Sequence, residues 1–269
     1  MENSNNRVSV AIPTYNSSQY IQECIKPLLS SKFIDQIIIS DDFSKEEEYF
    51  KLTNTINKIK KNTSKEIILS RNSSNLGAFR NKYKCIDMCR NELVYQLDSD
   101  NIPRNNIDSI IAQILSCGSK DHLFLPSKIY QFRNNHRNSK YLSLFNKKYI
   151  VRFSKKEMLI DLEIVKDFYK KNTKYTLDKN LGWVLNIGNF FTFKSTYKKF
   201  THKAVENSAM PLAMDAVAIS YFYLANQGKL NLLKNFYHFH RKREDSVSFT
   251  SGEKSDISSK FFRNKYLKD

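Results

Sequence analysis

The sequence has 269 residues, and 41% of them are hydrophobic, which is enough to bury one large core. Lysine and arginine (44) outnumber aspartate and glutamate (27), so the formal net charge is +17 and anionic ligands should be attracted. Glycine and proline are few, no apolar run reaches about 18 residues and no CxxC pair occurs, which argues against long linkers, a transmembrane helix and a cysteine-based zinc site.

The basic residues recur in short groups along the chain instead of in one tract, which favours a solvated surface over a dedicated polyanion-binding patch. The spacing of Cys85 and Cys89 places both on one helix face, where they are expected to be small core residues. The apolar run Val8–Ile12 is too short for a signal peptide, and the cysteine usage fits a reducing compartment, so we expect a cytoplasmic protein.

The N-terminal half alternates short apolar runs with segments whose apolar residues recur at helical spacing. The predicted strands are Val8–Ile12, Gln36–Ser40, Glu66–Ser70, Leu93–Leu97 and His122–Leu125, and the predicted helices run from Tyr20 to Leu29 with a kink at Pro27, from Glu46 to Lys61, from Gly77 to Cys89 and from Arg104 to Ser116. This order predicts βαβ units, a mainly parallel sheet and an α/β fold.

The second half is less regular and reads as a continuation of the same domain. Its predicted elements are a polar loop from Tyr130 to Arg152, a helix from Lys155 to Lys171, a strand at Asn186–Lys194, a helix from Met214 to Gln227 and a strand at Leu230–Phe239. Residues 251–269 form a basic, aromatic C-terminal tail that is expected either to lie on an anionic membrane surface or to pack on the domain as a terminal helix.

Polar side chains follow three of the predicted strands. The runs are Pro13 to Asn16 after the first strand, Asp41-Asp42 after the second and Asp98-Ser99-Asp100 after the fourth. Since the carboxyl ends of parallel strands share one edge, where open α/β sheets bind ligands, we expect these residues in one site. Two carboxylates separated by one residue suit Mg²⁺ or Mn²⁺.

A phosphate contact is predicted at the start of the third helix. Gly77 opens that helix and Arg80 lies in its first turn. Helix N-termini attract anions and a guanidinium binds phosphate through two hydrogen bonds, so Arg80 is a candidate diphosphate contact. The alternative is an ordinary exposed arginine.

Four ordered segments resemble the family-2 glycosyltransferases: VSVAIPTYN at Val8–Asn16, IIISDDFS at Ile37–Ser44, NLGAFRN at Asn75–Asn81 and VYQLDSD at Val94–Asp100. The resemblance covers residues 7 to 103 strongly and continues weakly to about residue 250. It implies one GT-A domain over residues 1–269, with a nucleotide-sugar-binding half at 7–103 and an acceptor-binding half at 104–250. It also implies metal-assisted transfer of a sugar with inversion at the anomeric carbon.

The resemblance also implies roles for residues. Pro13, Thr14 and Tyr15 would line the base and ribose, Asp42 would bond the base imide, typically of uracil, and Asp98 would approach the ribose or the metal, which Asp100 would ligate. The usual glycine after the aspartate pair is Phe43, which makes the turn unusual. With Arg80 added, the implied nucleotide-binding residues are Pro13, Thr14, Tyr15, Asp42, Arg80 and Asp98. The metal ion, Mn²⁺ or Mg²⁺, is assigned to Asp100, Asp98 and His240.

The later half supplies the base and the acceptor contacts. Inverting transfer needs a general base, and Asp215, at the start of a late helix, matches the family's base, with Glu206 as a competitor. Trp183, Asn186 and Asn189 lie where the family places acceptor contacts. His238 competes with His240 as the third metal ligand, and Arg241 or Arg243 is expected to grip the diphosphate.

The predicted function is therefore a glycosyltransferase with a UDP-linked donor, a dTDP or GDP donor being the alternative, and a glycan, protein or lipid-linked acceptor. Two rival hypotheses come from other classes. A sugar-phosphate nucleotidyltransferase would also use aspartate-bound Mg²⁺, but the loop after the first strand lacks the glycines it needs. A non-catalytic polyanion-binding domain would explain the charge and leave the acidic residues unexplained. We expect no nucleic-acid partner, and peripheral membrane contact only through the C-terminal tail.

Overall fold

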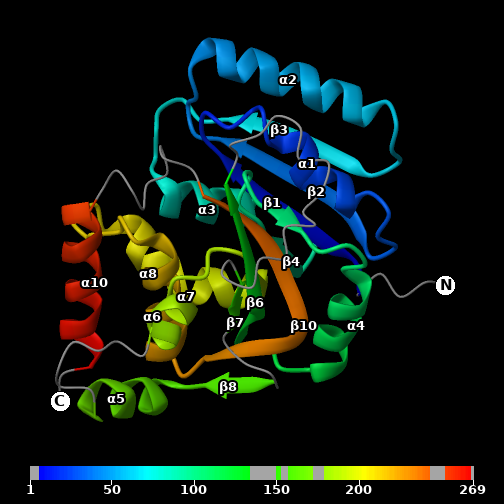
Figure 1. Cartoon of the computed structure of the whole chain (residues 1–269). Coiled ribbons are helices and arrows are strands. Elements are labelled where there is room, and N and C mark those ends of the chain that lie inside the picture. The colour runs from blue at the N-terminus through cyan, green and yellow to red at the C-terminus, as the bar shows by residue number, and fades with distance from the viewer. Residues whose placement is uncertain (1–5, 134–149, 153–156, 172–178, 243–251, 268–269) are drawn as a thin grey trace.

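The computed structural model describes residues 6–133, 150–152, 157–171, 179–242 and 252–267 (Figure 1). Among them, ten strands form one sheet with helices on both faces. The strands are β1 (Val8–Thr14), β2 (Ile34–Asp41), β3 (Glu66–Arg71), β4 (Leu93–Gln96), β5 (Ile102–Pro103), β6 (His122–Arg133), β7 (Ile150–Arg152), β8 (Met158–Ile160), β9 (Phe190–Phe193) and β10 (Lys229–Lys242). The helices are α1 (Ile21–Ile25), the 3₁₀ turn η2 (Lys26–Leu28), α2 (Glu46–Lys60), α3 (Ala78–Asp87), α4 (Asp108–Cys117), α5 (Leu162–Lys171), α6 (Lys179–Leu185), α7 (Lys194–Glu206), α8 (Asp215–Ala225) and α10 (Gly252–Tyr266).

The strand order is β3-β2-β1-β4-β9-β6-β10-β5. The first four strands pair in parallel, as predicted, and β9 pairs antiparallel with both β4 and β6. Strands β6 and β10 pair in parallel and therefore run in the direction of β1 and β4. The α/β prediction is confirmed, and the carboxyl ends of β1, β2 and β4 lie at one edge of the sheet.

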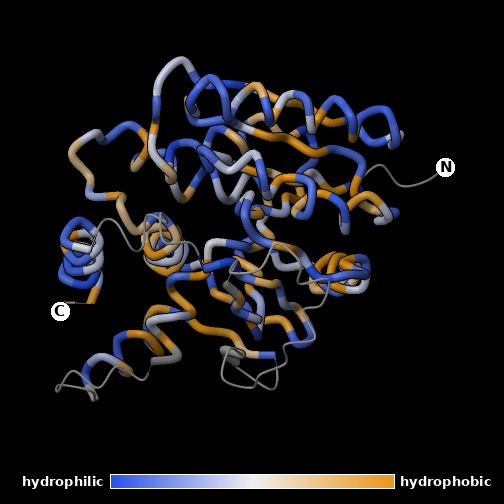
Figure 2. The backbone as a smooth tube through the Cα atoms, turned by 45° about the horizontal axis from the view of Figure 1, so that its top comes forward, coloured by the Kyte–Doolittle hydropathy of each residue, from blue (hydrophilic) through white to orange (hydrophobic). Residues whose placement is uncertain are grey.

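Side chains that point alternately to the two faces of the sheet divide the core into two layers. In β2, Ile37 and Ile39 belong to the cluster under α1, α2 and α4, whereas Ile38 belongs to the cluster under α3, α7 and α8. Successive side chains of a strand point to opposite faces, so a strand buried on both faces is hydrophobic throughout. Figure 2 shows this pattern, with hydrophobic colour along the central strands and mostly hydrophilic colour on the outer helix α2.

Helix α8 is buried on all sides, since every residue from Ala216 to Leu224 is inaccessible or nearly so. A helix that is apolar all round needs a cover, and α10 lies beside it in Figure 1. Phe262 of α10 is fully buried and stacks on Tyr221 at 6.0 Å between ring centroids. Residues 252–267 thus form a packed helix, one of the two arrangements expected for the tail, and membrane contact stays a prediction.

Several boundaries in the second half differ from prediction. The segment predicted as one helix from Lys155 to Lys171 contains β8 and α5, separated by Asp161, because β8 pairs with β10. The predicted loop from Tyr130 begins inside β6, which continues to Arg133, and residues 134–149 lie outside the described part. One boundary in the first half also differs: α4, predicted from Arg104, starts only at Asp108, after Asn106 in the left-handed region (φ +56°).

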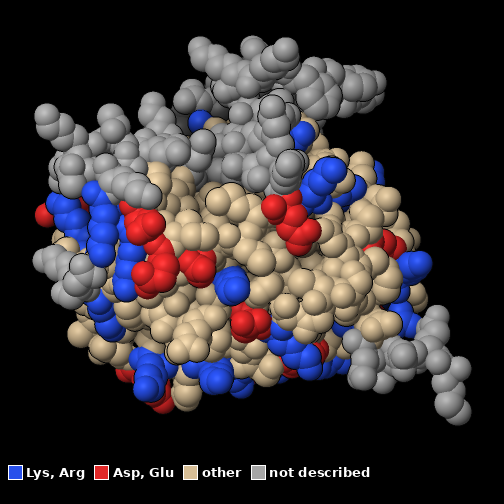
Figure 3. Space-filling view, turned by 90° about the horizontal axis from the view of Figure 1, so that it is seen from below, with Lys and Arg blue, Asp and Glu red and all other residues tan. Residues whose placement is uncertain are grey.

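On the face seen in Figure 3, the lysines and arginines drawn are interspersed with aspartates and glutamates and form no continuous basic patch. Within the described part of the chain, no helix is both long and apolar enough to cross a membrane. Cys85 of α3 and Cys89, two residues beyond the end of that helix, are both buried, as predicted, although only Cys85 is helical.

Candidate active site

The ends of β1 and β4 are tied together by hydroxyl groups. The Thr14 hydroxyl lies 2.7 Å from that of Ser17, which in turn lies 2.7 Å from the hydroxyl of Ser99. All three side chains are buried, so each hydroxyl needs a partner inside the protein. This chain joins the Pro13 to Asn16 turn to the Asp98-Ser99-Asp100 motif and holds both on one rim of the sheet.

Asp42 is fixed at the end of β2 by three donors. Its carboxylate accepts the backbone N–H groups of Leu76 (2.8 Å) and Gly77 (2.9 Å) and the side-chain amide of Asn72 (2.9 Å). A carboxylate offers about four acceptor positions, so capacity remains for one further donor. Tyr15 lies on the same rim with 49% of its surface exposed.

Phe43, which replaces the usual glycine of the family that the sequence resembles, adopts a conformation that glycine takes without strain. Its φ is +63°, in the left-handed region that bulky residues seldom occupy, and its side chain is half exposed. The turn is held regardless, because Ser44 donates its backbone N–H to Asp41 (3.1 Å) and Asn16 donates to the Ser44 hydroxyl (2.8 Å). The sequence departs from the family here, but the left-handed turn that the glycine would allow is present.

The centre of the site is a buried lysine between two carboxylates. The Lys82 ammonium lies 2.9 Å from Asp98 and 2.6 Å from Asp215, and the lysine side chain is 5% exposed. Burial alone would lower the pKa of Lys82, but the charges of Asp215 and Asp98 outweigh burial and raise it above its usual value. The ammonium is therefore charged at neutral pH and links the motif after β4 to the start of α8.

Sequence reasoning missed Lys82 and selected Arg80, two residues earlier on the same helix. Residues two apart on a helix point about 200° apart around its axis, so the two cations face opposite ways. Arg80 donates to the carbonyl oxygens of Val205 (3.4 Å) and Asn207 (3.2 Å) near the end of α7. The structure therefore does not bring Arg80 to the acidic rim. The available signal was that Lys82 falls within the apolar stripe of α3, where a charge needs a partner.

The backbone between α6 and β9 packs directly on Asp98. A Cβ atom at Gly188 would lie 2.6 Å from a carboxylate oxygen of Asp98 and 3.2 Å from the Lys82 ammonium, so only glycine fits here without displacement. The next residue, Asn189, is buried and its amide oxygen accepts the N–H of Asp98 (2.8 Å). Asn189 thus holds the acidic motif and does not line the cleft in which Trp183 and Asn186 lie.

Strand β10 brings His240 and Arg241 to the other side of the motif. Burial lowers the pKa of His240, and the charges of Asp100 and Asp98 offset this only in part, so the imidazole is neutral at neutral pH. The Arg241 side chain is buried; it donates to the Asp100 carbonyl (3.0 Å) and pairs with Glu23 (2.6 Å). Arg241 is thus built into the protein and braces the motif, while Arg243 lies outside the described residues.

A neutral imidazole beside carboxylates is a donor set that suits Mn²⁺ or Mg²⁺. Of the candidate ligands, Asp98 is paired with the Lys82 ammonium, and the charges of both Asp100 and Asp98 act on the His240 imidazole. Across the described ranges, no three His, Cys, Asp or Glu side chains are arranged as a ready-made metal site. His238, the alternative ligand, is buried within the sheet at 2% exposure.

Asp215 opens α8 between the acidic rim and a cleft of about 350 Å³. Met214 and Val217, on either side of Asp215, line this cleft together with Trp183 and Asn186. The competing base, Glu206, is exposed near the end of α7, where its neighbour is His202 at 3.6 Å. The structure therefore brings Asp215, and not Glu206, to Asp98.

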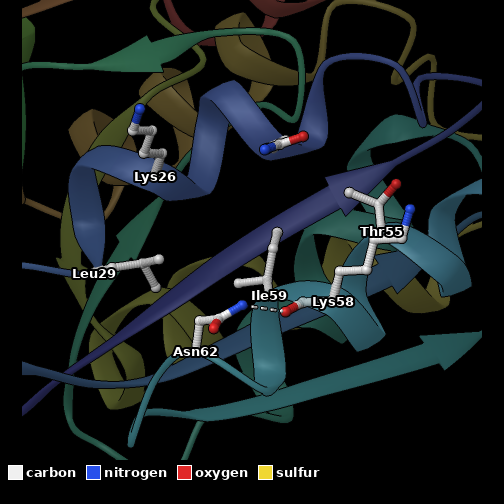
Figure 4. A pocket seen from close by; sticks show the side chains of 7 residues that line it. Lys26, Leu29, Thr55, Lys58, Ile59 and Asn62 are labelled. Carbon is white, nitrogen blue, oxygen red and sulfur yellow. Dashed lines mark hydrogen bonds between the residues drawn. The ribbon is translucent and has the colours of Figure 1, made fainter.

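A second cavity, of about 280 Å³, opens between α1 and α2 (Figure 4). Its lining includes Lys26, Lys58 and Asn62, and the Asn62 side chain caps α2 by donating to the Lys58 carbonyl (3.0 Å). None of the candidate site residues lines it. It is separate from the rim described above.

The fold and the acidic rim are those expected of a GT-A glycosyltransferase. A model described as glycosyl transferase family 2 matches residues 9–162, more than half of the sequence, and the chain belongs to this family. It is therefore a glycosyltransferase, and neither the nucleotidyltransferase nor the polyanion-binding hypothesis is retained. None of the curated proteins matches it significantly.

Solved structures show the same fold at low sequence identity. Residues 1–349 of TarS from S. aureus, in complex with UDP-GlcNAc, align with a TM-score of 0.59 and 17% identity over 90% of this chain and 60% of that one. GalNAc-T7 with UDP, GalNAc and Mn²⁺ aligns with a TM-score of 0.59 and 14% identity over 89% of this chain and 44% of that one. The chain thus spans less than two thirds of the length of either.

Proposed function

We propose that this glycosyltransferase transfers a sugar from a UDP-linked donor to an acceptor hydroxyl with inversion, assisted by a divalent cation. The observation that carries the proposal is the Lys82 bridge. It joins Asp98, in the motif assigned to the donor, to Asp215, the candidate base, through contacts of 2.9 Å and 2.6 Å. Donor and base would then meet within one site.

The rim offers a binding surface for the nucleotide. Asp42 is held rigidly and has capacity for one more donor, which fits the N3–H of uracil. Pro13, Thr14 and the exposed Tyr15 would flank the base and ribose. The solved structures of similar fold contain UDP-GlcNAc or UDP, which supports UDP over dTDP or GDP as the donor nucleotide.

Asp100 and His240 would hold the Mn²⁺ or Mg²⁺ ion. A bound divalent cation would neutralise the negative charge that develops on the diphosphate leaving group. Mn²⁺ is present in the GalNAc-T7 structure. Asp98, neutralised in part by Lys82, would act at the ribose or beside the cation, and Asn189 would hold its backbone instead of contacting the acceptor.

In the proposed reaction, Asp215 removes the proton from the acceptor hydroxyl as its oxygen attacks the anomeric carbon. The new carbon–oxygen bond forms as the bond to the diphosphate breaks, and attack from the opposite face inverts the configuration. Lys82 stabilises negative charge on Asp215 and fixes its direction. The position of Asp215 at the N-terminus of α8 adds the favourable helix dipole.

Binding of the donor is tested by thermal shift with UDP and UDP-GlcNAc, with and without Mn²⁺. A ligand at 100 times its Kd adds about 2.7 kcal/mol to the free energy of unfolding. Asp100→Ala is expected to remove the Mn²⁺-dependent part of this shift and to leave the unliganded melting temperature close to that of the wild type. The exposed Asp87→Ala is the control. Unchanged UDP affinity in Asp100→Ala, or equal wild-type affinity for UDP and CDP, would contradict the assignment.

Gly188→Ala is expected to lower turnover by about 10²-fold, the size of effect that follows from displacing a catalytic group by about 1 Å. The added Cβ would overlap Asp98 and crowd Lys82, so both must move. The measurement is the initial rate of UDP release from UDP-GlcNAc. Gly252→Ala is a matched control, because a Cβ there meets no atom within 4 Å. Equal rates in the two variants would show that the packing of Gly188 on Asp98 does not matter for activity.

A further inference from the structure

A cleft next to the start of α8 is lined mainly by helices of the second half. The cleft of about 350 Å³ is lined by residues of α6, α8 and α10, which lie side by side in Figure 1. Helix α10 belongs to the C-terminal tail, for which membrane contact is one of the two expected arrangements. In the structure it supplies Ser255, Asp256, Ser259 and Arg263 to the wall of the cleft.

The lining has the chemistry of a carbohydrate site. Trp183, 41% exposed, offers an aromatic face to the C–H surface of a sugar ring. Asn186 can donate and accept, Asp256 can accept two hydrogen bonds, and Ser259 supplies a hydroxyl, which together match adjacent sugar hydroxyls.

The charges in the cleft favour a neutral ligand over an anionic one. Arg263 is already engaged, since it donates to the Ser259 hydroxyl (3.2 Å) and lies 5.6 Å from the centre of the Tyr169 ring. The carboxylate of Asp256 lines the same cleft and opposes its charge. Arg263 and Asp256 give the lining one positive and one negative charge, so the cleft has no net positive charge that would favour a phosphate or a carboxylate.

Helix α10 also sets the approach to Asp215. The buried Ser258 hydroxyl donates to the Pro211 carbonyl (2.7 Å) and accepts the N–H of Met214 (3.3 Å). These bonds fix the chain immediately before Asp215. A ligand in the cleft would therefore contact Met214, which directly precedes Asp215, and Val217, in the first turn of α8. It would also contact α10, the helix whose Ser258 fixes the chain before Asp215.

We infer that this cleft is the acceptor subsite, that it takes a neutral hexopyranose unit, and that α10 recognises that unit through Asp256 and Ser259. The inference rests on the proposed function and adds to it the class of the acceptor and the helix that selects it. The sugar ring would lie against Trp183, with hydroxyl groups bonded to Asn186 and Asp256 and one hydroxyl directed to Asp215.

Trp183 is the only tryptophan of the sequence, so its fluorescence reports on the cleft directly. The full chain is titrated with the methyl β-glycosides of glucose, galactose and N-acetylglucosamine, and with glucose 6-phosphate as the anionic probe. At least one neutral glycoside is expected to change the emission with a Kd of about 1 mM, the affinity typical of a small exposed site. Asp256→Ala should weaken this binding about tenfold, which corresponds to the loss of one hydrogen bond to a charged group.

Glu253→Ala is the matched control, because Glu253 is an exposed carboxylate of the same helix that does not line the cleft. UDP release from UDP-GlcNAc in the absence of any acceptor is measured in parallel and is expected to be the same in wild type and Glu253→Ala. Three results would overturn the inference: no emission change with any neutral glycoside, equal weakening of glycoside binding in both variants, or tighter binding of glucose 6-phosphate than of the glycosides. UDP release by the wild type would in each case still support the proposed donor. If the wild type itself releases no UDP from UDP-GlcNAc, the result counts against the proposed function instead.

Discussion

Asp215→Asn is expected to lower sugar transfer by about 10²–10⁴-fold, the range that a general base contributes, while UDP-GlcNAc binding stays close to wild type. Asparagine keeps the shape of the side chain and removes the proton acceptor. Lys82 retains its contact with Asp98 at 2.9 Å, so the donor side of the site should remain ordered. The measurements are the transfer rate with a glycoside acceptor that binds the cleft, and UDP-GlcNAc affinity by thermal shift.

Glu206→Gln is the control for this experiment. The Glu206 side chain is 66% exposed near the end of α7, with His202 as its neighbour. The Glu206→Gln variant should therefore transfer sugar at the wild-type rate. A fully active Asp215→Asn together with an inactive Glu206→Gln would reverse the assignment of the base. Product that keeps the donor's anomeric configuration would contradict single displacement and with it the role of Asp215.

The first half of the fold could be predicted from the sequence because its signals are local. Strands such as Ile37–Ile39 are continuous apolar runs, and polar residues follow them directly, so the rim follows from the βαβ rule alone. The identity of Asp42, Asp98 and Asp215 as site residues came from ordered motifs. Lys82 and Gly188 escaped, and Arg241 was expected at the diphosphate and not as a brace of the acidic motif. The contacts that decide these roles join distant segments: Lys82 with Asp215, and Arg241 with the carbonyl of Asp100.

The second half was harder to predict because long-range pairing overrides local pattern there. Met158 and Leu159 fit a helical stripe with the residues that follow, yet they pair with β10 and leave α5 to begin at Leu162. Residues 251–269 combine aromatics with cations, a composition that a membrane-binding tail and a packed helix share. Burial of Phe262 against α8 shows the packed helix, and only the tertiary structure could show it.

Lys82→Met is expected to lower the free energy of unfolding by about 3 kcal/mol, the lower end of the cost of removing one partner from a buried ion pair. Methionine fills the volume but leaves Asp98 and Asp215 facing each other without the cation between them. The lower end applies because their side chains keep 29% and 19% exposure, which lets water screen part of the repulsion. Urea denaturation followed by circular dichroism measures the change.

The partners of Lys82 make this loss diagnostic. Lys198→Met removes an exposed pair with Asp87 and should cost about 0–1 kcal/mol, as surface ion pairs do. Adding Asp215→Asn to Lys82→Met removes the repulsion and should recover stability, so the two changes are expected to be non-additive. Two results would show that Lys82 does not hold the two carboxylates together. One is that Lys82→Met lowers the free energy of unfolding no more than Lys198→Met does; the other is that the change in the double variant equals the sum of the changes in the two single variants. The site would then have to be assembled by its backbone contacts alone, through Asn189 at Asp98 and Ser258 before Asp215.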